Sequence, residues 1–452
     1  MSLRQSLENT SKAWSPGSAN PRPVGYIDTK VYQELKSRVH RKLLDRVDLA
    51  KLEAMPAEQM KAEITSAVEK LLTEETLAIN ESEHKGLIID IQHEVFGLGP
   101  LESLMADPRV SDILVNTYRQ VYVEREGQLE LTDVRFESDA HLLKIIDKIV
   151  SAVGRRVDES SPMVDARLPD GSRVNAIIRP LAVDGPMLSI RRFSMVPLMM
   201  EDLVRHKSLT PEMAEILAGL VKSKVNLLVS GGTGTGKTTL LNAMSHAIPV
   251  TERIISIEDA AELQLQQPHV VRLETRPPNI EGKGEVPQRL LVRNSLRMRP
   301  DRIILGELRG AEAVDMLWAM NTGHEGSMGT IHANSPRDAL SRLEIMIGMA
   351  GLSLPPKAMR QQISSALTVV IQVTRLSDGK RKLTSLQEIT GMESDMITTQ
   401  EIFQFEQSGV APDGTVQGRF RATGIRPKFM DRLRVHGITL SPDLFDPSRV
   451  YE

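Results

Sequence analysis

The spacing of hydrophobic positions changes along the chain, and these changes divide it into segments. Between residues 30 and 82, apolar residues recur at helical spacing among many charges, which predicts a small helical bundle. Residues 83–193 mix alternating apolar stretches with one amphipathic stretch, which predicts an α+β domain. Over residues 207–375 short apolar runs alternate with helical patterns, an order typical of a parallel sheet covered by helices. We therefore expect an α/β protein with several domains.

Three further segments lack such a pattern. Residues 1–29 are rich in Ser, Asn, Pro and Gly, which predicts a disordered tail. Residues 194–206 contain Pro197 and begin without a clear period, so we place an interdomain linker there. Residues 376–452 predict short strands, with a Ser-Asp-Gly turn at 377–379, and then a basic segment at 426–434, and we interpret them as a C-terminal extension.

The α+β segment carries two hairpin patterns. The first joins residues 121–124 to 128–131, and the second joins 164–167 to 173–178 across a Pro-Asp-Gly turn. The amphipathic stretch at 142–153 predicts a helix. Further strands are expected at 112–115 and 188–193.

Candidate chemistry is concentrated after the linker. Residues 226–229 form a short apolar run, and Gly231–Thr238 then reads Gly-Gly-Thr-Gly-Thr-Gly-Lys-Thr, the P-loop pattern. Glycines let backbone N–H groups approach phosphates closely, Lys237 brings a positive charge to the terminal phosphates, and the Thr238 hydroxyl can bind Mg²⁺. A helix is expected from Thr239, so its N-terminus adds to the site. The expected ligands are ATP and Mg²⁺, held by Gly231, Gly232, Thr233, Gly234, Thr235, Gly236, Lys237, Thr238 and Thr239.

Two later apolar runs end in carboxylates. Residues 301–307 end in Glu307, as expected for a strand beside the P-loop strand that brings an acid to the γ-phosphate side. Gly306 occupies the position where the common form of this motif has Asp, so Mg²⁺ needs another carboxylate or water. Residues 254–257 lead to Glu258 and Asp259, which can supply that carboxylate or polarise the attacking water. Glu258 is thus both a candidate catalytic residue and a candidate metal ligand.

A row of arginines needs negative partners. Arg289, Arg293 and Arg297 have the spacing of one helix face. Their partners can be acids on the protein surface, or the phosphates of a nucleotide held by a neighbouring subunit.

Residues 321–335 contain two histidines, His324 and His332, among glycines and serines. The chain has no cysteine and the segment offers few other ligands, so a zinc site is disfavoured. A histidine that senses the γ-phosphate, through the nucleotide or Glu307, fits better. Ser335 then begins a helix as its N-cap.

Composition narrows the function classes. The chain has 452 residues, a formal net charge of −3 and 3% aromatic residues, a balance that disfavours direct nucleic-acid binding. The absence of cysteine excludes disulfides and thiol nucleophiles. No apolar run has the length of a membrane span and no signal peptide is recognisable, so a cytoplasmic location is expected.

Four stretches, taken together and in order, resemble the Walker A, Asp box, Walker B and His box of the ATPases of type II secretion, type IV pili and type IV secretion: residues 231–238, 254–263, 301–309 and 321–335. Residues 96–102, residues 154–175 and the N-terminal helices are similar to the CpaF branch, which serves tight-adherence (Tad) pili. The Asp box departs from the Asp-Pro-Ile-Glu of the type II and retraction branches, because residues 259–262 read Asp-Ala-Ala-Glu.

The resemblance implies a RecA-like P-loop domain in a homohexamer, with the nucleotide between the two domains of each subunit. It implies that Lys237 contacts phosphates, Thr238 binds Mg²⁺, Glu307 serves hydrolysis, Glu258 polarises water and His332 is a sensor. It also implies that Arg173, and Arg191 or Arg192, reach the γ-phosphate. The ring would dock on inner-membrane pilus platform proteins at the cytoplasmic face and drive pilus assembly, with retraction left open.

Three alternatives remain at this point. The first is a type IV secretion ATPase that moves protein or DNA substrates. The second is a nucleic-acid translocase, which the charge and aromatic content disfavour. The third is a nucleotide-gated scaffold that binds ATP without turnover, against which the candidate carboxylates and the arginine row argue.

Overall fold

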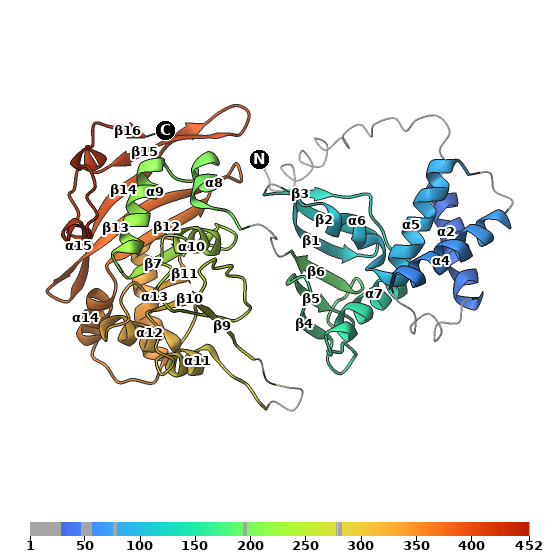
Figure 1. Ribbon diagram of the computed structural model, residues 1–452, viewed down its shortest axis with the longest axis horizontal. Coiled ribbons are helices and arrows are strands. Elements are labelled where there is room, and N and C mark those ends of the chain that lie inside the picture. Colours follow the sequence, from blue (N-terminus) through green and yellow to red (C-terminus); the bar gives the residue numbers. More distant parts are fainter. Residues whose placement is uncertain are drawn as a thin grey trace, which may run out of the picture. The chain divides into compact units, whose positions relative to one another are not determined.

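A computed structural model of the chain describes residues 29–46, 57–75, 79–125, 127–192, 197–276, 278 and 283–451. The chain divides into two compact units, of which the first ends at Arg192 (Figure 1). Residues 1–28 of the expected tail lie outside the described residues.

The first unit begins with three helices, α2 (Thr29–Arg46), α4 (Ala57–Thr73) and α5 (Glu81–Phe96). Their apolar faces meet in one core cluster, to which α2 contributes Leu35 and Val39. Helix α5 contributes Leu87 and Ile91 to the same cluster. The apolar residues at helical spacing thus form the core of the predicted bundle.

A six-stranded sheet follows the bundle in the order β3-β2-β1-β6-β5-β4, and the pairing from β2 to β4 is antiparallel. Both expected hairpins form, and helix α7 (Asp139–Ala152) packs its buried Leu142 and Ile145 onto this core. The short elements η1 (Gly99–Leu101) and α6 (Glu102–Ala106) lead into the sheet. Its strands are β1 (Val110–Thr117), β2 (Gln120–Arg125), β3 (Gln128–Leu131), β4 (Met163–Arg167), β5 (Arg173–Ile177) and β6 (Met187–Arg191).

The second unit contains a ten-stranded sheet in the order β16-β15-β14-β13-β12-β7-β11-β10-β8-β9. The six strands from β12 to β9 pair in parallel, as the alternation of runs and helices predicts. These strands are β7 (Leu227–Gly231), β8 (Ile254–Glu258), β9 (Val270–Glu274), β10 (Arg302–Leu308), β11 (Met328–His332) and β12 (Val369–Arg375).

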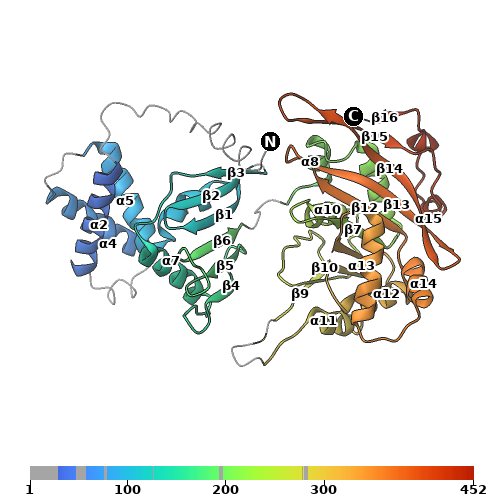
Figure 2. The same ribbon diagram turned by 180° about the vertical axis from the view of Figure 1, so that it is seen from behind.

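Helices cover both faces of this sheet. Helices α8 (Met200–Arg205), α9 (Pro211–Lys222), α10 (Lys237–Ser245) and α15 (Phe429–Val435) pack on the face seen in Figure 1. The opposite face, seen in Figure 2, is covered by α11 (Gln288–Ser295), α12 (Glu312–Asn321), α13 (Pro336–Met349) and α14 (Pro356–Ala366). Successive strand residues face opposite layers, so Leu227 joins the first core and Leu228 the second.

The C-terminal extension continues the main sheet, which the sequence did not predict. Strands β13 (Arg381–Glu393), β14 (Met396–Val410), β15 (Val416–Ala422) and β16 (Val450–Tyr451) add antiparallel to the edge at β12, with η2 (Pro442–Phe445) before the last. Strands β13 and β14 have 13 and 15 residues, so they are longer than the short strands expected. Helix α8 also lies within the expected linker. The predicted α/β fold class, a P-loop domain preceded by an α+β unit and a helical bundle, is confirmed.

Candidate nucleotide site

The P-loop lies between β7 and α10, as its motif requires. Strand β7 ends at Gly231, and α10 begins at Lys237, two residues before the expected start. A Cβ at position 231 would come within 2.5 Å of both Thr235 Oγ1 and the Val373 carbonyl oxygen, so only glycine fits there. Gly236 has φ of 94°, a left-handed conformation that favours glycine. The loop can thus turn tightly with its backbone exposed to a phosphate chain.

Lys237 is held by both the loop and the neighbouring strand. Its side chain is 7% exposed, and Nζ donates a hydrogen bond to the Gly232 carbonyl at 2.7 Å. Nζ also lies 3.4 Å from each ring nitrogen of His332, which ends β11 directly beside β7. The predicted phosphate-binding lysine and the predicted sensor histidine are therefore in contact.

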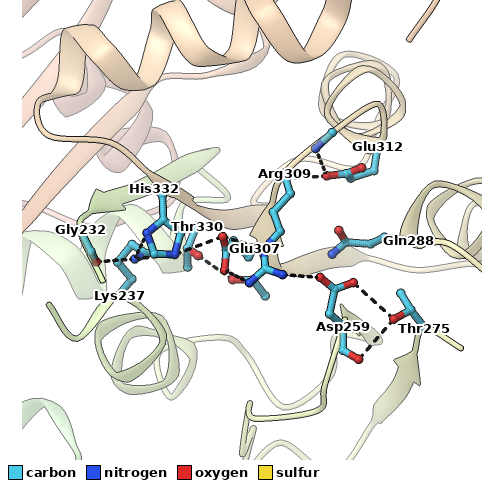
Figure 3. A network of polar contacts seen from close by, with 12 residues as sticks. Gly232, Lys237, Asp259, Thr275, Gln288, Glu307, Arg309, Glu312, Thr330 and His332 are labelled. Carbon is cyan, nitrogen blue, oxygen red and sulfur yellow. Dashed lines mark hydrogen bonds and ion pairs between the residues drawn. The ribbon is translucent and has the colours of Figure 1, made fainter. Parts of the chain in front are cut away.

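Glu307 completes this group at the end of β10. Its Oε1 lies 3.2 Å from His332 Nε2, so one carboxylate, one imidazole and Lys237 form a continuous polar chain (Figure 3). These three residues come from three segments that are far apart in the sequence. The parallel order of β7, β11 and β10 brings their carboxyl ends to one edge of the sheet.

Arg309 is a site residue that our sequence analysis did not single out. Its guanidinium contacts both oxygens of Glu307, each at 2.9 Å, and reaches Asp259 Oδ2 with Nη1 at 3.1 Å (Figure 3). Glu312 Oε1 accepts the backbone N–H groups of Arg309 and Gly310, each at 2.6 Å. The signal was available, because a cation two residues after a strand-end acid has that acid within reach.

The charges around Glu307 set its ionisation. Burial opposes the charged form, but the hydrogen bond and charge of Arg309, with His332 and Lys237, outweigh burial and hold the pKa of Glu307 below its ordinary value. Burial and the charge of Lys237 lower the pKa of His332 against the opposing effect of Glu307. The arrangement favours a carboxylate beside a neutral imidazole near pH 7.

Glu258 ends β8 and is 3% exposed. Its Oε2 accepts hydrogen bonds from the backbone N–H groups of Glu262 and Leu263 at 2.8 and 2.9 Å, whereas its buried Oε1 has no hydrogen-bond partner. Burial raises the pKa of Glu258 to about 7, against the two backbone N–H groups that favour the carboxylate. A carboxyl group with this pKa and one unpaired oxygen can act as a general base near neutral pH.

The protein residues suit a magnesium ion that shares its ligands with a nucleotide. Mg²⁺ in phosphate sites takes one or two protein oxygens and fills its other positions with phosphate and water. Thr238 follows the phosphate-binding lysine, and the unpaired Oε1 of Glu258 is an oxygen with no other hydrogen bond. Among the residues that the structure describes, no group of three or more His, Asp or Glu forms a metal cage.

The expected arginine row is only partly correct. Helix α11 ends at Ser295, so Arg297 lies beyond the helix and does not share its face. Arg289 Nε pairs with Asp315 Oδ2 at 2.8 Å, and Arg293 Nε lies 3.9 Å from the other oxygen of Asp315. The first two arginines therefore face an acid of their own chain, the ordinary ion pairing that we had considered.

The candidate arginines of the first unit lie on two adjacent strands. Arg173 begins β5 and Arg191 ends β6, and the two are direct cross-strand partners with exposed side chains. Arg192 is bound within its own unit instead, because its guanidinium donates to the Asp107 and Val110 carbonyls. Of these two alternatives, Arg191 is exposed at the end of β6, whereas Arg192 is engaged by backbone carbonyls.

The chain is similar in sequence to known proteins. Residues 94–425 match the protein family described as type II/IV secretion system protein. A protein of Mycobacterium tuberculosis named for conjugal transfer is 39% identical over 66% of this chain and 85% of its own length. The type IV secretion system protein VirB11 of Brucella suis is 33% identical over 62% of this chain and 84% of its own.

A solved structure is also similar to the chain. The crystal structure of the VirB11 ATPase from the Brucella suis type IV secretion system, in complex with sulphate, is 30% identical, covers 65% of this chain and 96% of its own, and has a TM-score of 0.35. None of the helices described here has both the length and the apolar character needed to cross a membrane.

Proposed function

The chain belongs to the type II/IV secretion system protein family, and on this basis we propose that it is an ATP hydrolase that drives a secretion or pilus machine. The observation that carries the proposal is the contact chain from Lys237 through His332 to Glu307 beside a P-loop. This chain joins the phosphate-binding cation to the acid that serves hydrolysis.

Different residues bind the phosphates, contact the γ-phosphate and orient the attacking water during phosphoryl transfer. Backbone N–H groups of the P-loop and of the first turn of α10 bind the phosphates, and Lys237 exchanges its bond to the Gly232 carbonyl for the terminal phosphates. Neutral His332 has a single ring N–H, which can donate to Glu307 or, once the nucleotide is bound, to a phosphate oxygen, while its other ring nitrogen can accept from Lys237. Glu307 stays ionised and orients the attacking water.

Thr238 and Glu258 would hold the magnesium ion, which neutralises phosphate charge when it is bound. The nearly neutral pKa of Glu258 also suits a second role, in which its carboxylate accepts a proton from water. Arg309 keeps Glu307 charged and in place, and is itself held by Asp259.

We further propose that the active form is a homohexamer at the cytoplasmic face of the inner membrane, bound there through partner proteins. Arg173 and Arg191, paired on one sheet, would reach the γ-phosphate from the first unit of the same or a neighbouring subunit. ATP binding would then draw the two units together and convert hydrolysis into movement.

Two machines remain candidates. Residues 96–102 and 154–175 are the sequence basis for a Tad pilus ATPase, which would act on pilus platform proteins. The relatives named for conjugal transfer and for VirB11 favour a type IV secretion machine that moves protein or DNA substrates. Both use the same ATP chemistry, so they differ in partner and not in site.

The direct test of nucleotide use is Lys237→Ala in the full chain. Binding of a fluorescent ATP analogue and release of phosphate should both fall by about 100-fold or more, since the variant loses the cation that faces the phosphates. Light scattering over a range of protein concentrations reports the assembly state in the same samples. Unchanged turnover in Lys237→Ala would overturn the proposed site, and full activity in a monomer would overturn the proposed ring.

A further inference from the structure

A second pair of arginines lies next to the P-loop, on the side away from Glu307. Strand β7 is flanked at Gly231 by His332 of β11 on one side and by Val373 of β12 on the other. The carboxylate and the histidine occupy the β11 side. Two residues beyond Val373, strand β12 ends at Arg375, and a short turn leads to Arg381 at the start of β13.

Arg381 is bound to the P-loop itself. Its Nε–H donates a hydrogen bond to the Gly234 carbonyl at 2.9 Å. Its Cδ lies 3.3 Å from where a Cβ on Gly236 would be, so the side chain follows the loop backbone. Arg375 Nη1 lies 3.6 Å from the corresponding position on Gly234. Two guanidinium groups therefore border the loop that is expected to bind phosphate.

The turn between β12 and β13 places Arg375 and Arg381 beside each other. Arg375 and Arg381 are direct cross-strand partners, so their side chains lie on one face of the sheet, and Arg375 Nη2 donates a hydrogen bond to the Gly127 carbonyl. The acid of the turn, Asp378, accepts a hydrogen bond from the Val416 N–H at 3.0 Å and lies 3.6 Å from Lys380 Nζ. Asp378 is thus engaged by β15 and by Lys380.

We propose that Arg381 binds the phosphate chain of the nucleotide, at the phosphates that ATP and ADP share. This inference rests on the proposed function, because it presumes that ATP occupies the P-loop. Arg381 borders the loop from the β12 side, whereas Glu307 and His332 lie on the β11 side and mark the γ-phosphate side. Its contact therefore strengthens binding without distinguishing the substrate from the product.

The consequence is a separation of binding from catalysis. An interaction made equally with substrate and transition state changes KM and leaves kcat nearly constant. Arg381→Gln should raise the dissociation constants of ATP and ADP by the same factor, about tenfold for one charge-assisted hydrogen bond. Arg381→Lys, which keeps the charge but not the planar donor group, should recover part of the loss.

The experiment measures binding of fluorescent ATP and ADP, competition by inorganic tripolyphosphate, and KM and kcat, in the full chain. Lys380→Gln is the matched control, since it removes one charge from the same turn at a residue that faces Asp378. The inference is supported if Arg381→Gln loses affinity for ATP, ADP and tripolyphosphate by the same factor while the thermal midpoint of the nucleotide-free protein stays unchanged. Lys380→Gln should bind all three ligands with wild-type affinity.

Three results would overturn the inference. Unchanged affinities would exclude a phosphate contact. Weaker binding of ATP and ADP with unchanged binding of tripolyphosphate would place the contact of Arg381 on the base or the ribose. A fall in kcat together with a lower thermal midpoint would mean that Arg381 only shapes the loop through Gly234. If the wild-type protein binds no ATP, the proposed function fails first, and this outcome is visible before any variant is compared.

Discussion

Gly306 of β10 lies directly against the side chain of Glu258 at the end of β8. A Cβ on residue 306 would come within 2.7 Å of Glu258 Cγ and 3.3 Å of its Cβ. The missing aspartate before Glu307 is thus matched by a buried glutamate from the neighbouring strand. The space that an aspartate side chain would need is already filled by the side chain of Glu258, whose carboxylate we assign to magnesium or water.

Gly306→Ala should therefore disturb the site by overpacking. We expect a loss of about 1–3 kcal/mol in the free energy of unfolding and a lower kcat, because Glu258 must move. Chemical denaturation and steady-state turnover measure the two effects. Gly348→Ala is the control, because a Cβ there meets nothing within 4 Å and α13 gains a better helix former. Equal free energies of unfolding and equal kcat values for the two variants would contradict the close contact between residue 306 and Glu258.

Glu258 should determine the acid limb of the pH profile. Burial raises its pKa to about 7, so the carboxylate is lost as the pH falls through about 7, and kcat should fall with it. Glu258→Gln should be nearly inactive and lack this limb. Glu388→Gln provides a comparison, because Glu388 is also buried with a raised pKa but accepts the backbone N–H groups of Lys428 and Phe429 far along the chain. An acid limb that persists in Glu258→Gln would contradict the assignment.

The same shift has a consequence for stability. The pKa of folded Glu258 is above its ordinary value of 4.5, so its contribution to stability is complete below that pH and is lost as the pH rises through about 7. Glu258→Gln should match the wild-type protein in acid and unfold at a higher temperature than wild type at about pH 8. A thermal shift series over pH measures this crossing, and a lower midpoint at high pH would count against it.

Arg309 should act through Glu307. Arg309→Gln removes the two contacts that fix the carboxylate, and we expect kcat to fall by about 10- to 100-fold. Asp259→Asn should lower kcat less than Arg309→Gln does. The double variant should have the same kcat as Arg309→Gln alone, because both changes break the same ion pair. Arg419→Gln breaks an exposed pair with Glu406 and should leave kcat within about twofold. Additive losses would mean that Arg309 and Asp259 act separately.

Arg191 should complement a P-loop defect if it acts between subunits. Arg191→Ala and Lys237→Ala should each be inactive alone, whereas mixed rings should regain turnover where an intact loop faces an intact arginine. Mixing Lys237→Ala with Glu307→Gln is the control, since these two side chains meet His332 in one chain and cannot be supplied separately. Inactivity of both mixtures would place Arg191 in the site of its own subunit.

Much of this site could be predicted because its residues follow local rules. The glycine spacing marks the P-loop, and Glu258 and Glu307 each end an apolar run that becomes a parallel strand, whereas His332 lies in a Gly/Ser-rich stretch whose strand the structure reveals. Parallel strands in one sheet bring such ends together. The contact between Lys237 and His332 follows from that rule once the strand order is known.

Other features depend on partners that are distant in the sequence. The place of Arg381 beside Gly234 requires the extension to return to β12, and nothing in its short apolar stretches indicates the pairing. The helix expected to carry Arg297 ends at Ser295, since boundaries depend on packing more than on spacing. The orphan oxygen of Glu258 likewise depends on the loop that folds over it.

The central claim is that Glu307 serves hydrolysis in a site that binds ATP without it. The most direct measurement compares ATP binding and magnesium-dependent phosphate release in wild-type protein and Glu307→Gln. We predict that the variant binds ATP with nearly the wild-type affinity and releases phosphate at least about 100-fold more slowly. Equal rates of phosphate release, or loss of ATP binding in Glu307→Gln, would contradict the account.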